Sequence, residues 1–575
     1  NACPVCGPKM TLLDNHGTTV DMQPADLLKM GYVLAVKGLG GFHLAVDAGN
    51  HEAVSRLRQR KHREAKPFAV MARDLAAVNK YCQVNEAEAR WLTSPQAPIV
   101  ILTSYDDDRL PGREIHPGIN TLGVMLPYTP LHFQLFADDL DLLIMTSANI
   151  SDQPLIIENH DAITELAGVA DYFLVHNRDI HNPCDDSVIR ITPEQTIQSY
   201  RRARGYVPRP ITLPFQLKPV LATGGDMKNT FCLTRYKFAF LSQHGGDLSH
   251  YLNYVRFQEA IPRFLKIVNT EPQIIAHDLH PDYQTSKWAK EQDLPRLEVQ
   301  HHHAHMAAAM AENHIEGDVI ALICDGTGYG TDGAVWGCEI LSGSYRSFVR
   351  QGHLRYVPLP GGDTSINRPY RMALVYLWQA LGMQGVEKAD QWLPDLTIEE
   401  REVLLKQITR GINTLPTSSC GRLFDAVSAL LGVCSISQYE GQAAVELEAM
   451  LSQQTVTGYS YQLEQENGMI IMNVLPMWRD IIDDLTGGCP KSEISGKFHA
   501  GLVNMFVDGI GKAAENAGLD RIILSGGTFY NQSLLTNLKS RLQQAGMQVF
   551  YPQHIPTGDG GLSLGQAVIA SEVNN

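Results

Sequence analysis

Residues 318–341, DVIALICDGTGYGTDGAVWGCEIL, contain an apolar run, a glycine-rich segment and a second apolar run. Such runs bounded by glycine are typical of buried strands, so the segment predicts a strand, a turn at Asp-Gly-Thr-Gly and a second strand. Residues 219–234, PVLATGGDMKNTFCLT, follow the same plan earlier in the chain, and residues 237–247, KFAFLSQHGGD, add a further strand. The two hairpins predict an internal repeat.

Two glycine-rich helix entrances lie near the end of the chain. Residues 521–531, RIILSGGTFYN, read as a strand entering a Gly-Gly turn, and residues 556–570, PTGDGGLSLGQAVIA, as a loop entering a helix. Glycine-rich entrances to helices are common phosphate-binding sites. Together with the hairpins they predict duplicated α/β halves with nucleotide phosphates between them, the plan of actin, Hsp70 and sugar kinases.

The preceding part of the chain alternates strand-like and helical segments. Residues 52–63, EAVSRLRQRKHR, predict a helix, and strands are expected at 32–37, 42–46, 66–72, 97–103, 141–149, 171–177, 187–192 and 196–202. This alternation predicts a twisted α/β sheet domain of about 200 residues. Proline is then dense over residues 205–219, where we expect little secondary structure and a linker at 208–219.

Composition excludes several classes of protein. A chain of 575 residues is too long for one core, so at least two domains are expected. Its net charge of −15 argues against a general nucleic-acid-binding protein, and no nucleic-acid partner is expected. No apolar run approaches ~18 residues, so no membrane span is predicted. The ten cysteines are typical of reduced thiols and predict a cytoplasmic location. Cys3 and Cys6 form half of a zinc site, so residues 1–14 are interpreted as the remnant of a zinc-binding module.

Basic side chains are concentrated in an otherwise acidic chain. Six of them fall within eleven positions, and a second group precedes Gly205: Arg56, Arg58, Arg60, Lys61, Arg63 and Lys66, then Arg201, Arg202 and Arg204. Two such groups could together bind a triphosphate, although a solvated helix face is the usual outcome of a charge run. Thr146–Asn149, TSAN, would add neutral donors, or else form an ordinary cap or turn.

These residues resemble the YrdC family over roughly residues 15–205. The similarity rests on Lys61-x-Arg63-x-x-Lys66-Pro67, the triplet Ser147–Asn149, Ser187 in DDSVIR, and RARG at 202–205. The family binds ATP and a carbamate-type acid and forms an acyl adenylate. The resemblance implies a YrdC-like domain at 15–207, with Lys61, Arg63 and Lys66 as catalytic residues. It implies a nucleotide site lined by Ser147, Asn149, Ser187, Arg201 and Arg204.

Four histidines lie within five positions in residues 299–309, VQHHHAHMAAA. The absence of glycine, proline and β-branched residues predicts a helix over 300–314. On a helix His301 and His305 share a face, as do His302 and His305, so spacing leaves two candidate metal-binding pairs beside the alternative of structural histidines. Asp325 and Asp559 lie next to glycine-rich segments. Two imidazoles with two carboxylates would suit Fe²⁺ or Zn²⁺.

The second part of the chain, residues 220–575, resembles the TsaD-like portion of the HypF carbamoyltransferase family. The motifs that carry this similarity are GGDMKNTF (224–231), SQHGGDL (242–248), HDLHPDY (277–283), VQHHHAH (299–305), DGTGYGTDGAVWG (325–337), LPGGD (359–363), SSCGRLFDAV (418–427), YEGQAAVELE (439–448), LSGGTFYN (524–531) and PTGDGG (556–561). The resemblance implies His301, His305, Asp325 and Asp559 as metal ligands. It implies that Lys228, Asn229, Gly526, Gly527 and Asn531 help to hold nucleotide.

The resemblance implies a complete reaction. ATP, with Mg²⁺, and carbamate derived from carbamoyl phosphate would form carbamoyl-AMP in the first domain. The second domain would transfer the carbamoyl group to the C-terminal cysteine of HypE, a step in [NiFe]-hydrogenase maturation. In this family an acylphosphatase domain and zinc fingers precede the matched region, and Cys3 and Cys6 resemble the last part of the latter. Because carbamoyl-AMP hydrolyses easily, we expect a channel between the two sites that excludes water.

Three other functions remain open at this stage. Enzymes of tRNA threonylcarbamoylation and of natural-product O-carbamoylation combine the same two folds, but the acidic balance disfavours tRNA and the Cys-x-x-Cys remnant favours HypF. A nucleotide-gated RNA-binding scaffold using Arg56–Lys66 is the non-enzymatic alternative. The sequence does not decide whether the protein forms a homodimer, and it assigns no role to Glu440 or to a cysteine nucleophile.

Overall fold

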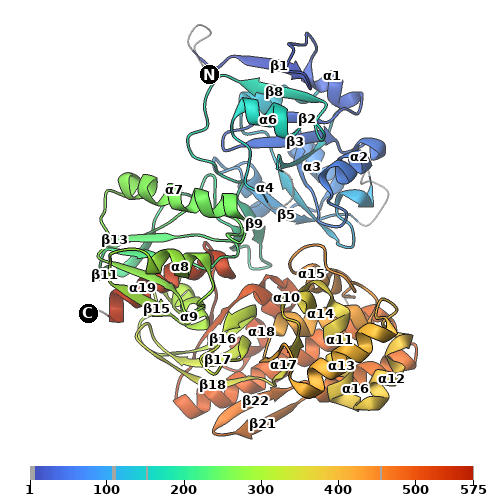
Figure 1. Cartoon of the computed structure of the whole chain (residues 1–575), viewed down its shortest axis with the longest axis vertical. Helices are drawn as coiled ribbons and strands as arrows, with labels where there is room; N and C mark the ends of the chain where they lie inside the picture. The colour runs from blue at the N-terminus through green and yellow to red at the C-terminus, as the bar shows by residue number, and fades with distance from the viewer. Residues whose placement is uncertain (1–6, 106–111, 150–152, 453–455, 574–575) are drawn as a thin grey trace. The chain divides into compact units, whose positions relative to one another are not determined.

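The computed structural model describes residues 7–105, 112–149, 153–452 and 456–573. The chain forms two compact units, each described here by itself (Figure 1). The first unit extends to Arg209 and includes two later segments, Asp226–Asn229 and Ser242–Phe264. The second unit consists of Pro210–Gly225, Thr230–Leu241 and the chain from Leu265 onward. Among the helices of the described residues, none combines the length and apolar composition that crossing a membrane requires.

A ten-stranded mixed sheet forms the centre of the first unit. The strand order is β1-β8-β2-β3-β7-β4-β6-β5-β9-β10. The strands are β1 (Met10–Asp14), β2 (Leu34–Lys37), β3 (Phe42–Asp47), β4 (Ala69–Ala72), β5 (Ile99–Thr103), β6 (Thr121–Met125), β7 (Leu142–Ser147), β8 (Tyr172–His176), β9 (Val188–Ile191) and β10 (Ile197–Arg201).

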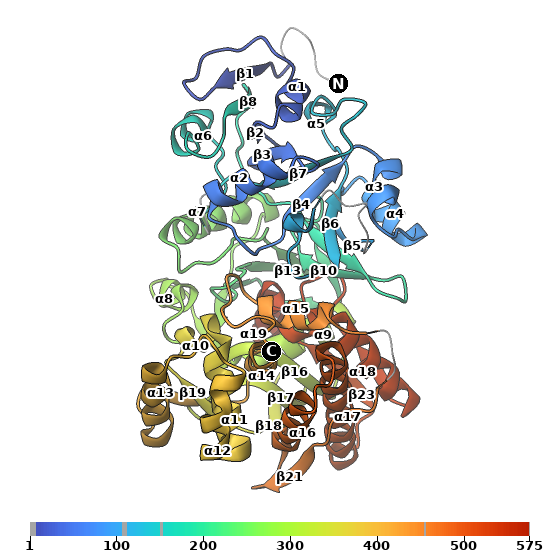
Figure 2. The same ribbon diagram turned by 90° about the vertical axis from the view of Figure 1, so that its right-hand side faces the viewer.

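This sheet is buried on both faces. Side chains of a strand alternate between faces, and in β3 Phe42 and Leu44 pack into one apolar cluster while Ala45 packs into the other. Short helices cover the sheet, as Figure 2 shows. They are α1 (Pro24–Lys29), α2 (His51–Lys61), α3 (Leu75–Tyr81), α4 (Glu86–Leu92), α5 (Pro130–Phe133) and α6 (Asn159–Glu165), with a 3₁₀ turn at Arg113–Ile115.

Strand β1 corrects one predicted boundary. Residues 10–14 were expected to belong to a zinc-module remnant, yet they pair antiparallel with β8 and form an edge of the first-unit sheet. The alternation of Leu12 and Leu13 with polar neighbours suits such an edge. Cys3 and Cys6 lie outside the described residues.

The second unit contains two sheets. The five-stranded sheet has the order β11-β13-β12-β14-β15 and the nine-stranded sheet follows β21-β22-β18-β17-β16-β23-β24, with β19 and β20 joined at β17. Their strands are β11 (Ile211–Leu217), β12 (Val220–Ala222), β13 (Cys232–Leu241), β14 (Ile274–Asp278), β15 (Arg296–Val299), β16 (Val319–Tyr329), β17 (Val335–Gly343), β18 (Phe348–Leu354), β19 (Val357–Pro360), β20 (Thr414–Thr417), β21 (Gln462–Glu466), β22 (Met469–Asn473), β23 (Arg521–Ser525) and β24 (Gln548–Phe550).

Both sheets are built on one plan. Each contains an antiparallel hairpin, β12–β13 in one sheet and β16–β17 in the other. In each, the first hairpin strand pairs in parallel with a later strand, β14 or β23, which pairs in parallel with the next, β15 or β24. The predicted duplication of α/β halves is therefore confirmed.

Helices surround and separate these sheets. They are α8 (Gln284–Lys290), α9 (His301–Glu312), α10 (Asp363–Asn367), α11 (Pro369–Leu381), α12 (Met383–Lys388), α13 (Ile398–Arg410), α14 (Cys420–Leu430), α15 (Gln442–Ala449), α16 (Leu475–Thr486), α17 (Lys491–Ala517), α18 (Gln532–Gln544) and α19 (Leu562–Val573). Helix α7 (Tyr251–Val268) belongs to the first unit up to Phe264. Among the described residues of this unit there are three 3₁₀ turns, η2 (Ala389–Gln391), η3 (Gly527–Tyr530) and η4 (Asp559–Gly561).

Strand β16 is buried on both faces, which explains its unbroken apolar run. Val319, Ala321 and Ile323 pack into the cluster that contains α9 and α19, whereas Ile320, Leu322 and Cys324 pack into the cluster that contains α11 and α14. By this alternation Asp325 belongs to the α9 face. The next residue after the apolar run is therefore directed at the histidine helix.

Helices α9 and α19 lie side by side in both views (Figures 1 and 2). Their approach depends on glycine, because a Cβ at Gly565 would lie 1.9 Å from the carbonyl oxygen of Ala304. The run of small residues in α9, from Ala307 to Ala309, is buried in the same cluster. Close helix contact thus follows from small side chains on both partners.

Three expectations about local structure were wrong. The predicted linker 208–219 contains β11, which pairs with β13, because alternating apolar residues around Pro214 outweigh the proline signal at a sheet edge. Residues 232–241 form one long strand, not two. Strand β16 continues through Asp325–Tyr329 with a register shift, so the turn lies later, where Gly330 bonds to Ala334.

Candidate functional site

Four side chains that can bind a metal ion come together in the second unit. His301, His305, Asp325 and Asp559 offer ligand atoms that all lie within 4.8 Å of one another. The Nε2 atoms of His301 and His305 lie 3.3 and 3.4 Å from Oδ2 of Asp325. Both lie 3.8 Å from Oδ1 of Asp559. Two imidazole nitrogens and two carboxylate oxygens suit a borderline divalent ion such as Fe²⁺ or Zn²⁺.

Three elements position these four side chains. Helix α9 begins where the side chain of Gln300 accepts a hydrogen bond from the amide of His303, and it places His301 and His305 one turn apart on one face. Strand β16 supplies Asp325 on the face that packs against α9. The turn η4, which leads into α19, supplies Asp559.

Asp278 holds His301 in the orientation that metal binding needs. Nδ1 of His301 lies 2.8 Å from Oδ2 of Asp278, so Nε2 is the ring atom left to face Asp325 and Asp559. The other oxygen of Asp278 accepts a hydrogen bond from the amide of His280 at 2.9 Å. Metal-bound histidines usually have such a carboxylate on their second nitrogen. Asp278 was not among the predicted site residues, although HDLHPDY contains it at the end of an apolar strand.

The electrostatics of the group favour a bound cation. Burial opposes the charged imidazolium of His301, yet Asp278, Asp325 and Asp559 together raise its pKa well above the usual range. Burial likewise opposes the carboxylate of Asp325, but the imidazoles of His301 and His305 beside it hold its pKa well below the usual range. Nε2 of His305 is buried and outside hydrogen-bonding geometry. A cation among the four groups would satisfy this nitrogen and balance the carboxylates.

The other two histidines of the motif lie elsewhere. His302 packs edge-on against Trp336, with ring centroids 5.8 Å apart, and its Nδ1 lies 3.4 Å from Nε2 of Gln300. Nε2 of His303 lies 2.8 Å from the carbonyl oxygen of Ser344. Of the two pairs that spacing allowed, His301 with His305 is the one that faces the carboxylates.

In the first unit, the Lys-x-Arg segment and the Ser-Ala-Asn triplet meet. Helix α2 ends at Lys61, whose ammonium donates to the carbonyl oxygens of Ser147 and Asn149 at 2.7 and 2.8 Å. It also donates to Oδ1 of Asn149 at 3.1 Å. Lys61 is buried, so this ammonium fixes the turn after β7 and is not a solvated surface charge.

Arg63 lies beside the same turn. Its guanidinium donates to Oγ1 of Thr146 at 3.2 Å, to the carbonyl oxygen of Lys66 at 3.2 Å and to that of Pro67. It also stacks over Phe68, 5.0 Å from the ring centroid. These contacts bring the side chains of the predicted catalytic residues Lys61 and Arg63 to one turn, with the backbone of Lys66 beside them.

Arg58 shows that the charge run is not simply a solvated face. Its guanidinium donates to the carbonyl oxygens of Arg63, Glu64, Lys66, Glu114 and Ile115. Burial lowers its pKa to about 10. Arg58 thereby shapes the backbone that carries Arg63 and Lys66.

Ser187 and Arg204 are engaged in a buried polar network. Oγ of Ser187 donates to the carbonyl oxygen of Arg204 at 2.9 Å. The Arg204 guanidinium donates to Asp186 at 2.7 Å and stacks 3.6 Å above the ring of Tyr128. His43 joins the network through Asp186 at 3.0 Å. His43, Tyr128 and Asp186 were not among the predicted site residues. The adjacent acidic pair in CDDSVIR is the sequence feature that points to Asp186.

Arg201 lies apart from that network. Its guanidinium is 3.7 Å from Asp185, and about a third of the side chain is exposed. This leaves Arg201 as the more accessible of the two arginines that were predicted to line the nucleotide site.

The predicted nucleotide-binding residues of the second part of the chain fall into two groups. Lys228 and Asn229 belong to the first unit, where the amide of Asn229 bonds to Gly246. Gly526, Gly527 and Asn531 belong to the second. Gly526 has φ of +104°, and a Cβ there would lie 2.2 Å from the carbonyl oxygen of Cys324.

Gly527 and Asn531 make specific contacts in the second unit. The amide of Gly527 donates to Oδ1 of Asp325 at 3.2 Å, so this glycine helps to orient a candidate metal ligand. The side chain of Asn531 caps α18 at Leu534 and donates to Nε2 of His499 at 2.9 Å. Burial lowers the pKa of His499 to about 4, which keeps it a neutral acceptor.

Three family sequence models match the chain. The model described as "Telomere recombination", of the Sua5, YciO and YrdC proteins, matches residues 26–203. The model "HypF Kae1-like domain" matches 216–312, and "Carbamoyltransferase, Kae1-like Domain, second subdomain" matches 321–566.

Curated relatives are similar over nearly the whole chain. The carbamoyltransferase HypF of Synechocystis is 39% identical over 557 residues, which cover 94% of this chain and 71% of the relative. This chain belongs to the HypF family. The HypF of Rhodobacter capsulatus is 40% identical over 99% of the chain and 76% of its own length.

Solved HypF structures agree with this assignment. A full-length HypF in a phosphate- and nucleotide-bound form is 42% identical, with a TM-score of 0.95 over all of this chain and 75% of that one. HypF of T. kodakarensis is 35% identical, with a TM-score of 0.93 over 100% of this chain and 76% of that one. The expected family and the YrdC-like and TsaD-like folds are confirmed.

Proposed function

We propose that the chain is an ATP-dependent carbamoyltransferase that first forms carbamoyl-AMP and then transfers its carbamoyl group to the C-terminal cysteine of HypE. HypF-family membership supports the overall activity. The observation that supports two separate reaction steps, adenylation and carbamoyl transfer, is the presence of two chemically different sites. One is the cationic region around Lys61 and Arg63; the other is the group of two histidines and two aspartates.

The first step is adenylation in the first unit. An oxygen of carbamate attacks the α-phosphorus of ATP, a P–O bond to the β-phosphate breaks, and pyrophosphate leaves. Negative charge spreads over the phosphates, so the protein needs to position the reactants and neutralise charge; it needs no nucleophile of its own. Lys61, Arg63 and Lys66 are the catalytic cations in this proposal, with Mg²⁺ accompanying the ATP. Ser147, Asn149, Ser187, Arg201 and Arg204 shape the nucleotide site.

The second step is transfer to sulfur. The cysteine thiolate attacks the carbamoyl carbon, a C–S bond forms, the C–O bond to AMP breaks, and AMP leaves with the electron pair. For this step the proposal assigns nucleotide binding to Lys228, Asn229, Gly526, Gly527 and Asn531. His301, His305, Asp325 and Asp559 would hold Fe²⁺ or Zn²⁺. When bound, such an ion supplies Lewis acidity toward a substrate oxygen.

The supply of carbamate is part of the proposal. The chain spans about three quarters of the length of the relatives it matches. We assign hydrolysis of carbamoyl phosphate to an acylphosphatase domain upstream of the matched region. We also propose a cytoplasmic location, because the eight described cysteines are free thiols.

Two assays separate the two steps. ATP–pyrophosphate exchange, with carbamate from ammonia and bicarbonate, reports adenylation. Mass spectrometry of a peptide that ends in cysteine reports transfer as a carbamoyl adduct, with a peptide ending in serine as control. We expect Lys61→Met to lower exchange at least 100-fold, and His305→Ala to keep exchange while abolishing the adduct.

Arg60→Lys is the matched control for Lys61→Met. Arg60 lies on the same helix, but its partly buried guanidinium donates to Asp171 and to the carbonyl oxygen of Val169, away from the contacts of Lys61. Its exchange rate should equal that of the unchanged chain. Carbamate-independent exchange, or an adduct that forms equally well in the Lys61→Met variant, would contradict the proposed order of steps.

A further inference from the structure

Three cysteines from distant parts of the sequence converge behind the histidine–aspartate site. Cys324 on β16 and Cys338 on β17 are direct partners in the antiparallel register, and their Sγ atoms lie 3.2 Å apart. Cys420 is the first residue of α14. The three Sγ atoms all lie within 4.8 Å of one another. Strands β16 and β17 and helix α14 therefore each supply one sulfur atom to the same small cluster.

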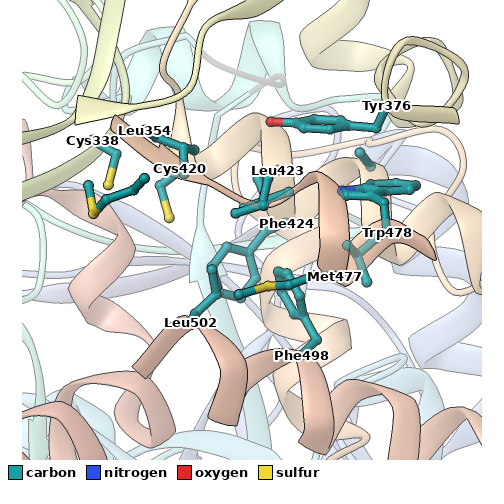
Figure 3. Packing of buried hydrophobic residues seen from close by; sticks show 14 of the residues in the cluster. Cys338, Leu354, Tyr376, Cys420, Leu423, Phe424, Met477, Trp478, Phe498 and Leu502 are labelled. Carbon is teal, nitrogen blue, oxygen red and sulfur yellow. The ribbon is translucent and has the colours of Figure 1, made fainter. Parts of the chain in front are cut away.

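The surroundings of the three sulfurs are apolar and closed to solvent. All three cysteines are 0% exposed and belong to the largest apolar cluster of the second unit. Figure 3 shows Cys338 and Cys420 close together beside Leu354, with Leu423 and Phe424 beyond them. Among the described residues, no fourth histidine, cysteine or acidic side chain joins the group. The site thus offers three sulfur ligands and is closed to water, with the neutral hydroxyl of Thr528 hydrogen-bonded to Cys420.

This ligand set selects for one kind of ion. Thiolates in a dry environment favour the d¹⁰ cations Cu⁺, which is soft, and Zn²⁺, which is borderline. Structural zinc sites are closed by four ligands, whereas three sulfurs without a fourth donor suit a three-coordinate ion. Metal–sulfur bonds of about 2.3 Å would place three trigonal sulfurs roughly 4 Å apart, a spacing that the cluster can reach by small side-chain shifts.

We propose that Cys324, Cys338 and Cys420 form a three-coordinate binding site for Cu⁺. Binding displaces thiol protons to solvent and changes no oxidation state. Because Cys420 begins α14, the positive end of the helix dipole offsets negative charge on the sulfurs. The site is separate from the histidine–aspartate group, since Cys324 and Asp325 face opposite sides of β16. A bound ion would tie β16, β17 and α14 together directly behind Asp325.

The test measures copper in the full chain. Copper is supplied during expression and again as Cu⁺ to the chain purified without oxygen, and unbound metal is removed with a Cu⁺ chelator and gel filtration. Metal per chain is then measured by mass spectrometry, and X-ray absorption reports the ligand atoms. We expect about one copper per chain, bound by sulfur alone at about 2.3 Å.

Matched variants locate the ion. His305→Ala removes the nitrogen and oxygen site, and Cys232→Ser alters a buried cysteine on β13 outside the cluster; both should retain copper. Cys338→Ser and Cys420→Ser should each lower retained copper at least tenfold, with circular dichroism confirming that they fold. The X-ray absorption measurement uses the unchanged chain, so it tests the proposal even if a cysteine variant fails to fold.

Three results would overturn the proposal. They are copper-free protein after both loading steps, nitrogen or oxygen atoms in the copper ligand shell, or equal copper retention in Cys338→Ser. A chain that is 2 Da lighter and lacks copper would also overturn it, by showing that two cysteines have formed a disulfide; Cys324 and Cys338 are already in contact.

Discussion

Asp278 and His301 are joined by a 2.8 Å contact between Oδ2 and Nδ1 in a fully buried environment. The contact determines which imidazole nitrogen faces the other three candidate ligands. We expect Asp278→Asn to weaken binding of Fe²⁺ or Zn²⁺ by ~10–100-fold, because an amide cannot match the carboxylate's charge or fix the ring as firmly. Competition with a coloured chelator measures the affinity. Asp282→Asn, an exposed change in the same loop, should leave it unaltered; equal affinities for both variants would show that Asp278 has no such role.

His305 and His303 provide a paired test of the metal site on one helix. His305 faces Asp325 and Asp559, whereas His303 points to the carbonyl oxygen of Ser344. We expect His305→Ala to reduce bound divalent metal at least tenfold and to abolish the rise in melting temperature on adding metal, since a ligand that binds the folded state stabilises it. His303→Gln should preserve both responses. Metal content by mass spectrometry and differential scanning calorimetry decide between these outcomes.

His132 should make the first unit less stable in acid. Both of its ring nitrogens are buried without a hydrogen bond, and burial, aided by the nearby His43, lowers its pKa to about 3. The unfolded chain therefore binds the proton more tightly than the folded chain. The associated stability is complete above about pH 6.5 and falls as the pH drops from there toward about 3.

The size of this effect can be measured locally. Between about pH 7.5 and about pH 5.5 the loss attributable to His132 is about 1.4 kcal/mol. Amide hydrogen exchange over residues 121–147, corrected for intrinsic rates, reports it, and His132→Gln should remove it. The exposed His16→Gln variant is the control. If His132→Gln keeps the same pH slope, the imidazole is not the group responsible.

Gly565 and Gly511 should respond in opposite directions to an added methyl group. At Gly565 the new Cβ would lie 1.9 Å from the Ala304 carbonyl oxygen, where α19 and α9 meet. We expect Gly565→Ala to destabilise the second unit by about 3 kcal/mol through overpacking. Gly511 lies within α17 and has no neighbouring heavy atom within 4 Å of an added Cβ. Gly511→Ala should raise stability by about 0.5–1 kcal/mol. Scanning calorimetry measures both shifts.

Much of this architecture could be predicted because it depends on local patterns. The apolar run at 319–324 indicated a buried strand, and alternation within it directs Asp325 toward α9. Helical spacing allowed two histidine pairs, and only the tertiary position of Asp325 distinguishes them. Spacing does not reveal Asp278, because the parallel pairing of β14 with β15 is what brings it to His301 at the start of α9. The same limit applies to the predicted linker 208–219. Its prolines predicted irregular structure, but its weak alternating pattern forms strand β11 when β13 is available as a partner.

The basic cluster illustrates the other limit. Charge alone does not distinguish a structural arginine from the predicted catalytic residues. Arg58 donates to five backbone carbonyl oxygens, whereas Lys61 and Arg63 contact the Thr146–Asn149 turn. Those tasks differ only in what surrounds each side chain after folding. The three converging cysteines also lie 14 and 82 residues apart along the chain, too far for spacing to reveal a site.

Because β16 is buried on both faces, its pairing register with the neighbouring strands cannot change without loss of function. A slip of one position along its neighbours would turn the carboxylate of Asp325 toward the dry side of the sheet and a thiol toward the imidazoles. A shift of one residue would thus remove a ligand from the candidate metal site and leave a carboxylate unpaired in the apolar cluster on the other face. Insertions or deletions upstream of Asp325 can therefore be tolerated in the loop before Val319, but not inside the strand itself.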